Sequence, residues 1–160
     1  GRIWKLHSLM ANKMNVYISY FYNIRFFPTN LIPVSTAMYD PKWYHDFKSN
    51  DTIFKDKRGI LNGLRADVLS PYIIESTECK NCKSNKNPSI CSFIKQYRDY
   101  IFSLSFNEIY DWLYDISLKC NNADICLIVY EKPDNPCSER STLVEWFSKN
   151  GVEVKEFSRS

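Results

Sequence analysis

The clearest pattern in the chain is an unbroken apolar run from Ile125 to Val129, rich in β-branched residues and followed by a cluster of Pro, Asp and Asn. A run this short and this apolar predicts a strand buried on both faces, as in the middle of a parallel sheet. Beyond the cluster, apolar residues between Ser138 and Lys149 fall at helical spacing. A strand, a loop and a helix start place polar groups at the C-terminal edge of an α/β sheet, where we expect the functional site.

The rest of the pattern predicts further strands and helices around this unit. Alternating or β-rich stretches indicate strands at 15–21, 31–36 and 152–157, and Pro33 indicates an exposed edge or an irregular strand. Helical spacing predicts helices over 90–102 and 105–119, the second with Ser105 as N-cap and Glu108 at the capping-box position. Asn150-Gly151 is typical of a helix end. Strands linked by helices, with a final β-α-β unit, predict a three-layer, Rossmann-like α/β domain with a mostly parallel sheet.

Two stretches between these elements are less regular. Residues 23–30 predict a loop or one short helical turn. Residues 49–67 are charged and contain two glycines, which indicates a long excursion that folds back over the sheet edge and brings Arg58 and Arg65 there as further ligand candidates.

Length and composition fit one domain. The chain has 160 residues, enough for a core that needs no disulfides. We expect the domain over 15–160, with a cysteine-bearing insertion around 76–92. Residues 1–14 are expected to form an extension, native or added, since both Met10 and Met14 are plausible starts. The net charge of +3 is too small to predict nonspecific nucleic-acid binding by charge alone. Neither a membrane span nor a secretion signal is expected, which favours the cytoplasm, including that of a phage host.

The six cysteines indicate thiols or a metal site in a reducing compartment. Cys79 and Cys82 form a C-x₂-C turn, and eight residues separate it from Cys91. This turn can present two thiolates to one Zn²⁺, so these three cysteines predict a structural zinc site. Surface thiols, a labile disulfide and buried thiols remain alternatives. The fourth ligand stays open among Cys120, Cys126, Cys137, a carboxylate, a water and a histidine.

Candidate chemistry gathers after the central strand. Glu131 is the candidate general base or ribose-binding group, and Cys137 at the predicted helix start is a candidate nucleophile whose thiolate the helix dipole favours. Backbone N–H groups at Ser138, with Arg140, predict an anion pocket for a phosphate or carboxylate. Further candidate ligand-binding residues are Lys132 and Glu139 in the same unit and Ser19, Tyr20, Ser35, Tyr39 and Trp43 at the ends of the other strands, with Tyr20, Tyr39 and Trp43 placed to stack on a base. The alternative is structural: Glu131 pairs with Lys132 or Arg140, and Cys137 fills a core position.

Two long stretches carry a resemblance to a known family. The segments Val16–Tyr44 and Cys126–Phe157 resemble the domain-of-unknown-function family 488 of bacteria, archaea and phages, and CSFIKQYRDYIFSLSF with the preceding cysteines resembles one of its branches. The most specific motif is an EKP loop followed by a cysteine and a basic residue at a helix start. Many members carry Cys-His-Arg where this chain has Cys137-Ser138-Glu139-Arg140, so the histidine is absent. The resemblance implies an α/β fold but no settled activity.

Two functions of different classes follow. The first is an enzyme that binds a nucleotide, nucleoside or nucleic-acid base and hydrolyses a glycosidic or phosphoester bond, with Glu131 as acid, base or nucleophile. The second is a non-catalytic nucleotide or nucleic-acid binding module with a zinc-stiffened loop. A thiol-dependent redox or transfer enzyme built on Cys137 ranks lower, because Ser138 replaces the neighbouring base. A Glu131 with a shifted pKa in a cleft favours the enzyme, and one in a buried salt bridge favours the module.

Overall fold

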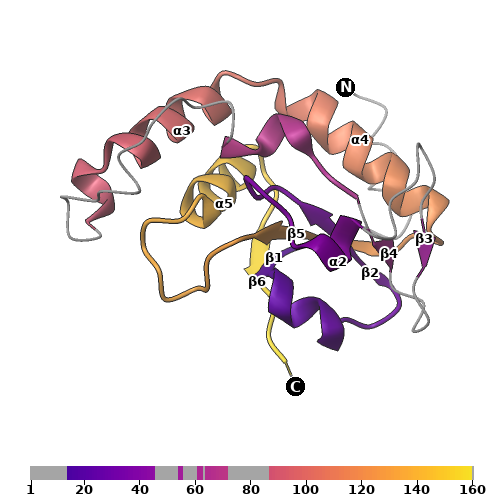
Figure 1. The fold of residues 1–160 in the computed structure, drawn as a ribbon. Helices are drawn as coiled ribbons and strands as arrows, with labels where there is room; N and C mark the ends of the chain where they lie inside the picture. Colours follow the sequence, from indigo (N-terminus) through magenta and orange to yellow (C-terminus); the bar gives the residue numbers. More distant parts are fainter. Residues whose placement is uncertain (1–13, 46–53, 56–60, 63, 72–86, 160) are drawn as a thin grey trace.

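A four-stranded sheet forms the centre of the molecule in the computed structural model, which describes residues 14–45, 54–55, 61–62, 64–71 and 87–159 (Figure 1). The strand order is β2-β5-β1-β6, and every neighbouring pair is parallel. The strands are β1 (Val16–Tyr20), β2 (Leu31–Ser35), β5 (Asp124–Val129) and β6 (Val154–Glu156). This confirms the predicted α/β class, a three-layer Rossmann-like arrangement with a parallel sheet.

Helices cover the two faces of this sheet. The α-helices are α2 (Lys42–His45), α3 (Ser92–Phe102), α4 (Phe106–Lys119) and α5 (Arg140–Lys149), and the 3-10 helices are η1 (Phe21–Phe26), η2 (Asp67–Leu69) and η4 (Pro88–Ile90). Figure 1 shows α3, α4 and α5 above the sheet and η1 below it. The predicted excursion at 49–67 contains a short antiparallel pair, β3 (Phe54–Lys55) with β4 (Leu61–Asn62).

The central strand β5 is buried on both faces, as its apolar run predicts. Ile125, Leu127 and Val129 belong to the core shared with α3, α4 and α5. Cys126 and Ile128 belong to the opposite core, which η1 and α2 complete with Phe21, Ile24 and Tyr44. All five strand residues are fully buried. The alternation of side chains along β5 therefore joins both layers to one strand.

The connections place the layers by their handedness. The steps from β2 to β5 and from β5 to β6 run in the same direction across the sheet, so right-handed crossovers put their helices on one face. The step from β1 to β2 runs the opposite way and puts η1 on the other face. At the adjacent carboxyl ends of β1 and β5 the chain therefore leaves toward opposite faces. Such a switch point is where open α/β sheets bind their ligands.

The edge strand β2 is covered rather than exposed. The prediction from Pro33 is correct about the edge position but wrong about exposure, because all of β2 is buried. The N–H of Ser35 donates to the carbonyl of Leu64 at 2.9 Å, and the N–H of Ala66 donates to the carbonyl of Ser35 at 2.9 Å. The hydroxyl of Tyr44 reaches the carbonyl of Pro33 at 3.2 Å. The segment that contains Arg65 thus folds back on the sheet edge, as expected, while Arg58 lies outside the described residues.

The helix ends follow their sequence signals with one exception. The Ser105 hydroxyl accepts the N–H of Glu108 at the start of α4, as predicted. The last helix, α5, begins at Arg140 rather than at Ser138, with Glu139 as its N-cap. At its other end the N–H of Val152 donates to the carbonyl of Phe147 at 2.9 Å, which closes the helix around Gly151.

Gly151 provides a test of this helix end. Its φ is +84°, in the left-handed region, and a Cβ there would meet no atom within 4 Å. We therefore expect Gly151→Ala to lower the free energy of unfolding by about 1 kcal/mol through backbone strain alone. Urea denaturation measures the change. Ser148→Ala, at an exposed position of the same helix, is the control and should cause no loss; equal stability of both variants and the wild type would contradict the assignment.

Candidate functional site

Arg140 closes the loop that joins β5 to α5. Its Nη1 donates to the backbone carbonyl of Glu131 at 2.8 Å, and its Nε lies 2.8 Å from Oε1 of Glu156 at the end of β6. Its backbone N–H donates to the Ser138 hydroxyl at 3.0 Å. One nearly buried arginine therefore ties together the end of β5, the start of α5 and the end of β6.

These contacts change the role expected for Ser138 and Arg140. The predicted anion pocket uses the first N–H groups of the helix and the guanidinium of Arg140. In the structure, the Ser138 side chain already accepts the N–H of Arg140, and the guanidinium has a carboxylate and a carbonyl as partners. Arg140 thus positions the loop around Glu131. It forms its salt bridge with Glu156 rather than with Glu131.

Glu131 and Glu139 form a carboxyl pair beside this arginine. Glu139 is only 3% exposed, and burial, reinforced by the charge of Glu131, raises its pKa to about 8. Glu131 is half-buried, and burial also raises its pKa, against the charge of Arg140 and hydrogen bonds from Ser138 and Glu139. Because two neighbouring buried carboxyls cannot both ionise without repulsion, the pair retains one proton at neutral pH.

The accessible member of the pair is Glu131. Within the described part of the chain, Oε1 of Glu139 is buried and has no hydrogen-bond partner. A buried oxygen of this kind is costly unless the carboxyl stays neutral. Glu139 therefore acts behind Glu131 as the protonated partner, and Glu131 is the group that a ligand can reach.

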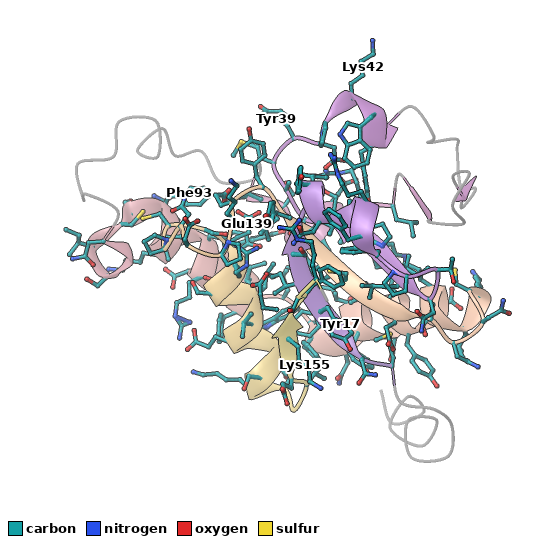
Figure 2. All side chains as sticks on the ribbon, turned by 90° about the horizontal axis from the view of Figure 1, so that it is seen from below. Tyr17, Tyr39, Lys42, Phe93, Glu139 and Lys155 are labelled. Atoms are coloured by element: carbon teal, nitrogen blue, oxygen red, sulfur yellow. The ribbon has the colours of Figure 1, made fainter. Side chains whose placement is uncertain are left out.

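Tyr97 of α3 lies in the core on the helical side of the sheet, near enough to the pair for its charges to act on the phenol. Its side chain is fully buried, and its hydroxyl donates to the carbonyl of Leu69 at 2.6 Å. Burial raises the pKa of Tyr97, and the charges of Glu139 and Glu131 add to the rise, which places the phenol in the field of both carboxyls. In Figure 2, Glu139 lies in the same half of the molecule as Phe93 of α3 and Tyr39, away from Lys155.

A second polar cluster lies at the end of β2. Ser35 donates to Asp40, and Nη1 of Arg65 donates to Oδ1 of Asp40 at 2.5 Å. Nη2 of Arg65 donates to the carbonyl of Ala37 at 2.8 Å. These contacts hold the 36–40 loop, from which Tyr39 projects with 76% of its surface exposed. Ser35 is fully buried and fixes the loop, and the exposed ring of Tyr39 is the part that is open to a ligand.

The remaining candidates lie at the end of β1, in α2 and in the loop after β5. Ser19 is buried under η1 and accepts a hydrogen bond from Nδ2 of Asn23 at 3.0 Å. Trp43 contacts Phe21 edge-on at 6.3 Å between ring centroids and is partly exposed, as is Tyr20. Lys132 is exposed in the loop after β5.

Cys137 lies in the loop and not at the helix start. It is partly buried, and its N–H donates to Oδ1 of Asn135 at 3.0 Å. Because α5 begins three residues later, the helix dipole acts on this thiol more weakly than the sequence indicates.

A hollow of about 540 Å³ lies between this loop and α5. Its walls are Pro133, Asn135, Pro136, Ser138, Arg140, Ser141, Val144, Glu145, Ser148 and Lys149. The hollow shares with the carboxyl pair the loop that Arg140 organises, but neither Glu131 nor Glu139 lines it.

The sequence does not single out Glu156 or Tyr97 as site residues. Glu156 could be found by one rule, because the carboxyl ends of parallel strands meet at one edge and the strand that carries Glu156 is predicted. Tyr97 shows no such signal, because it fits the apolar stripe of α3 like any core aromatic.

The zinc site stays a prediction. Cys79 and Cys82 lie outside the described residues. Cys91 is buried against Phe93 and Ile94 at the start of α3. Within the described ranges no group of three or more metal-ligating side chains occurs.

The carboxyl pair makes stability depend on pH. Glu139 has a higher pKa in the folded chain (about 8) than the roughly 4.3 of an unfolded glutamate, so the folded state binds more protons between these values. The free energy of unfolding therefore falls as the pH rises through this window, by at most about 1.4 kcal/mol per pH unit for one proton. We expect Glu139→Gln to flatten this fall in urea titrations from pH 5 to pH 8, because the amide cannot ionise. Glu153→Gln, at an exposed position, should keep the wild-type slope; a wild-type slope in Glu139→Gln would contradict the shared proton.

Comparisons with known proteins leave the family open. No family model matches the chain, and neither the curated proteins nor the solved structures contain a match. The resemblance of the 16–44 and 126–157 segments to the domain-of-unknown-function family 488 stays a prediction. Within the described residues, no helix has the length and apolar character needed to cross a membrane.

Proposed function

We propose that the protein is a hydrolase that works at the carboxyl edge of the sheet. It cleaves the glycosidic bond that joins a base to its sugar in a nucleoside, a nucleotide or a nucleic acid. The observation that carries this proposal is the Glu131–Glu139 pair, two neighbouring carboxyls with raised pKa values at the end of the central strand. Such pairs are uncommon as stabilising devices, because burial disfavours their charge, and common as acid–base groups.

The pair supports a definite division of labour. Glu131, the reachable member, accepts a proton from the attacking water, whose oxygen forms the new bond to the sugar carbon. The proton already held by the pair then goes to the departing base, so the pair ends with the one proton it started with. Arg140 positions Glu131 through its backbone carbonyl, and Glu156 holds Arg140 in place. Glu139 acts through Glu131 as a positioning and proton-sharing residue.

The charge of the site favours a glycosidic over a phosphoester bond. Breaking a glycosidic bond develops positive charge on the sugar ring, which a nearby carboxylate stabilises. A phosphoryl group is negative throughout its transfer and needs cations around it. Arg140, whose charge acts on the Glu131 carboxyl, is already paired with Glu156. The nucleobase part of the proposal rests on the switch-point position and on the exposed ring of Tyr39.

The non-catalytic module receives less support. Its mark is a Glu131 held in a buried salt bridge, whereas Arg140 forms that bridge with Glu156. The resemblance to family 488 fits either function. We retain the fold it implies and draw no reaction from it.

The test is to incubate the protein with a panel of nucleosides and oligonucleotides and to measure the released free base by chromatography. We expect release by the wild type and a rate at least about 100-fold lower for Glu131→Gln, since the amide cannot accept a proton. Glu153→Gln makes the same change at an exposed carboxyl and should release base at the wild-type rate. Cys137→Ser should also keep its rate, which separates this mechanism from thiol chemistry. The proposal fails if the wild type binds ligands without releasing base, or if Glu131→Gln is as fast as the wild type.

The cysteine segment carries a separate proposal, a structural zinc ion held by Cys79, Cys82 and Cys91. Its support is the C-x₂-C spacing and the buried position of Cys91 at the start of α3. We expect about one zinc per chain by elemental analysis, and loss of both the zinc and thermal stability in Cys79→Ser. Ser148→Ala, at an exposed position of α5, is the control and should keep both the zinc and the thermal stability. Metal-free wild-type protein would contradict this site.

A further inference from the structure

The 3-10 helix η1 carries exposed aromatic and arginine side chains that the proposed mechanism does not use. Four residues form this surface, which we call the η1 ridge: Tyr22, Arg25, Phe26 and Arg159. Tyr22 is 48% exposed and Phe26 is 43% exposed, with their ring centroids 5.9 Å apart. In Figure 1 the C-terminal tail descends beside η1 below the sheet, which brings Arg159 to the ridge.

The arginines lie on the aromatic rings. The guanidinium carbon of Arg25 is 4.1 Å from the centroid of Tyr22. That of Arg159 is 4.6 Å from the centroid of Phe26 and 5.8 Å from that of Tyr22. These cation–π contacts hold two flexible side chains over flat rings and so reduce the entropy that a ligand contact would cost.

The ridge is positive and consists of flat π systems. Neither Phe21–Phe26 nor the 157–159 segment contains an acidic residue. The one aliphatic side chain of η1, Ile24, is buried in the core and not on the ridge. Exposed aromatic rings suit a partner with flat faces, and the two arginines suit a partner with negative charge.

We infer that the η1 ridge binds single-stranded nucleic acid. Unpaired bases stack on aromatic rings and on guanidinium planes, and arginines also contact the phosphates between them. A duplex hides its base faces and offers only its backbone to such a surface. With a net charge of only +3 on the whole chain, binding depends on stacking at the ridge rather than on a general positive field.

The ridge runs toward the carboxyl pair. The ring of Tyr22 stacks with that of Tyr20, with centroids 6.5 Å apart and planes 16° apart. Tyr20 is the last residue of β1 and pairs in register with Val129, two residues before Glu131. A strand stacked along the ridge is thus directed to the switch point between β1 and β5. The binding role goes beyond the proposed hydrolase and does not depend on its catalytic step.

Fluorescence anisotropy with a labelled oligothymidylate of about 15 nucleotides tests the inference. We expect the wild type to bind it more tightly than a duplex of the same length. Tyr22→Ala with Phe26→Ala should weaken binding on the order of tenfold or more. Trp112→Ala, a similarly exposed aromatic on α4, is the matched control and should bind as the wild type does.

A second variant keeps the test independent of folding effects. Arg159→Gln changes an exposed side chain outside the helices and strands, and it should reduce the slope of log affinity against log salt by about 0.7, the value for one lost contact to a single-strand phosphate. If the wild type binds the oligonucleotide but releases no base, the hydrolase is contradicted and the ridge is supported. Equal affinity for duplex, an unaffected Tyr22/Phe26 variant, or a dimer that this variant abolishes in sedimentation would overturn the inference.

Discussion

The burial of β5 on both faces is the constraint from which the rest of the structure follows. A strand packed between two cores cannot place a polar side chain along its length, so the first polar groups appear where it ends, at Glu131 and beyond. Its neighbours β1 and β2 are parallel to it and end at the same edge. The crossovers then send the chain to opposite faces beside that edge. The position of the candidate site is therefore a consequence of packing and handedness before any chemistry is considered.

The same edge concentrates unfavourable burial in one place. Glu139 is nearly inaccessible to water, and an ionised carboxylate there would cost far more than a neutral one. A nearby arginine and a shared proton reduce this cost, but the guanidinium of Arg140 makes its contacts with the backbone carbonyl of Glu131 and with the carboxylate of Glu156. A fold that needed only stability at this position would be served better by an apolar residue. This cost is the reason for proposing that the pair acts on a bound molecule, which we propose the η1 ridge helps to hold.

Much of the fold was predictable from the sequence because local signals and burial agree. The five-residue apolar run of β5, the stripe of α4 and the Asn150-Gly151 helix end each depend on short-range periodicity or on one backbone angle. The misjudged features depend on contacts between distant segments. Pro33 correctly marks an edge strand, but only the 64–66 segment shows that the edge is covered. The sequence places Glu139 among the candidate ligand-binding residues. Its burial beside Glu131 results from the start of α5 at Arg140, which no periodicity fixes to within two residues.

The proposed role of the site depends on one proton that Glu131 and Glu139 share at neutral pH. Carbon NMR of selectively labelled glutamate side chains, assigned with Glu139→Gln, measures this directly as a titration curve for each carboxyl. We expect the Glu139 carboxyl, whose pKa burial raises, to titrate near pH 8, and the pKa of the Glu131 carboxyl to lie above its ordinary value because of its own burial. If both carboxyls titrate independently near the ordinary glutamate value of about 4.3, Glu131 and Glu139 do not share a proton at neutral pH.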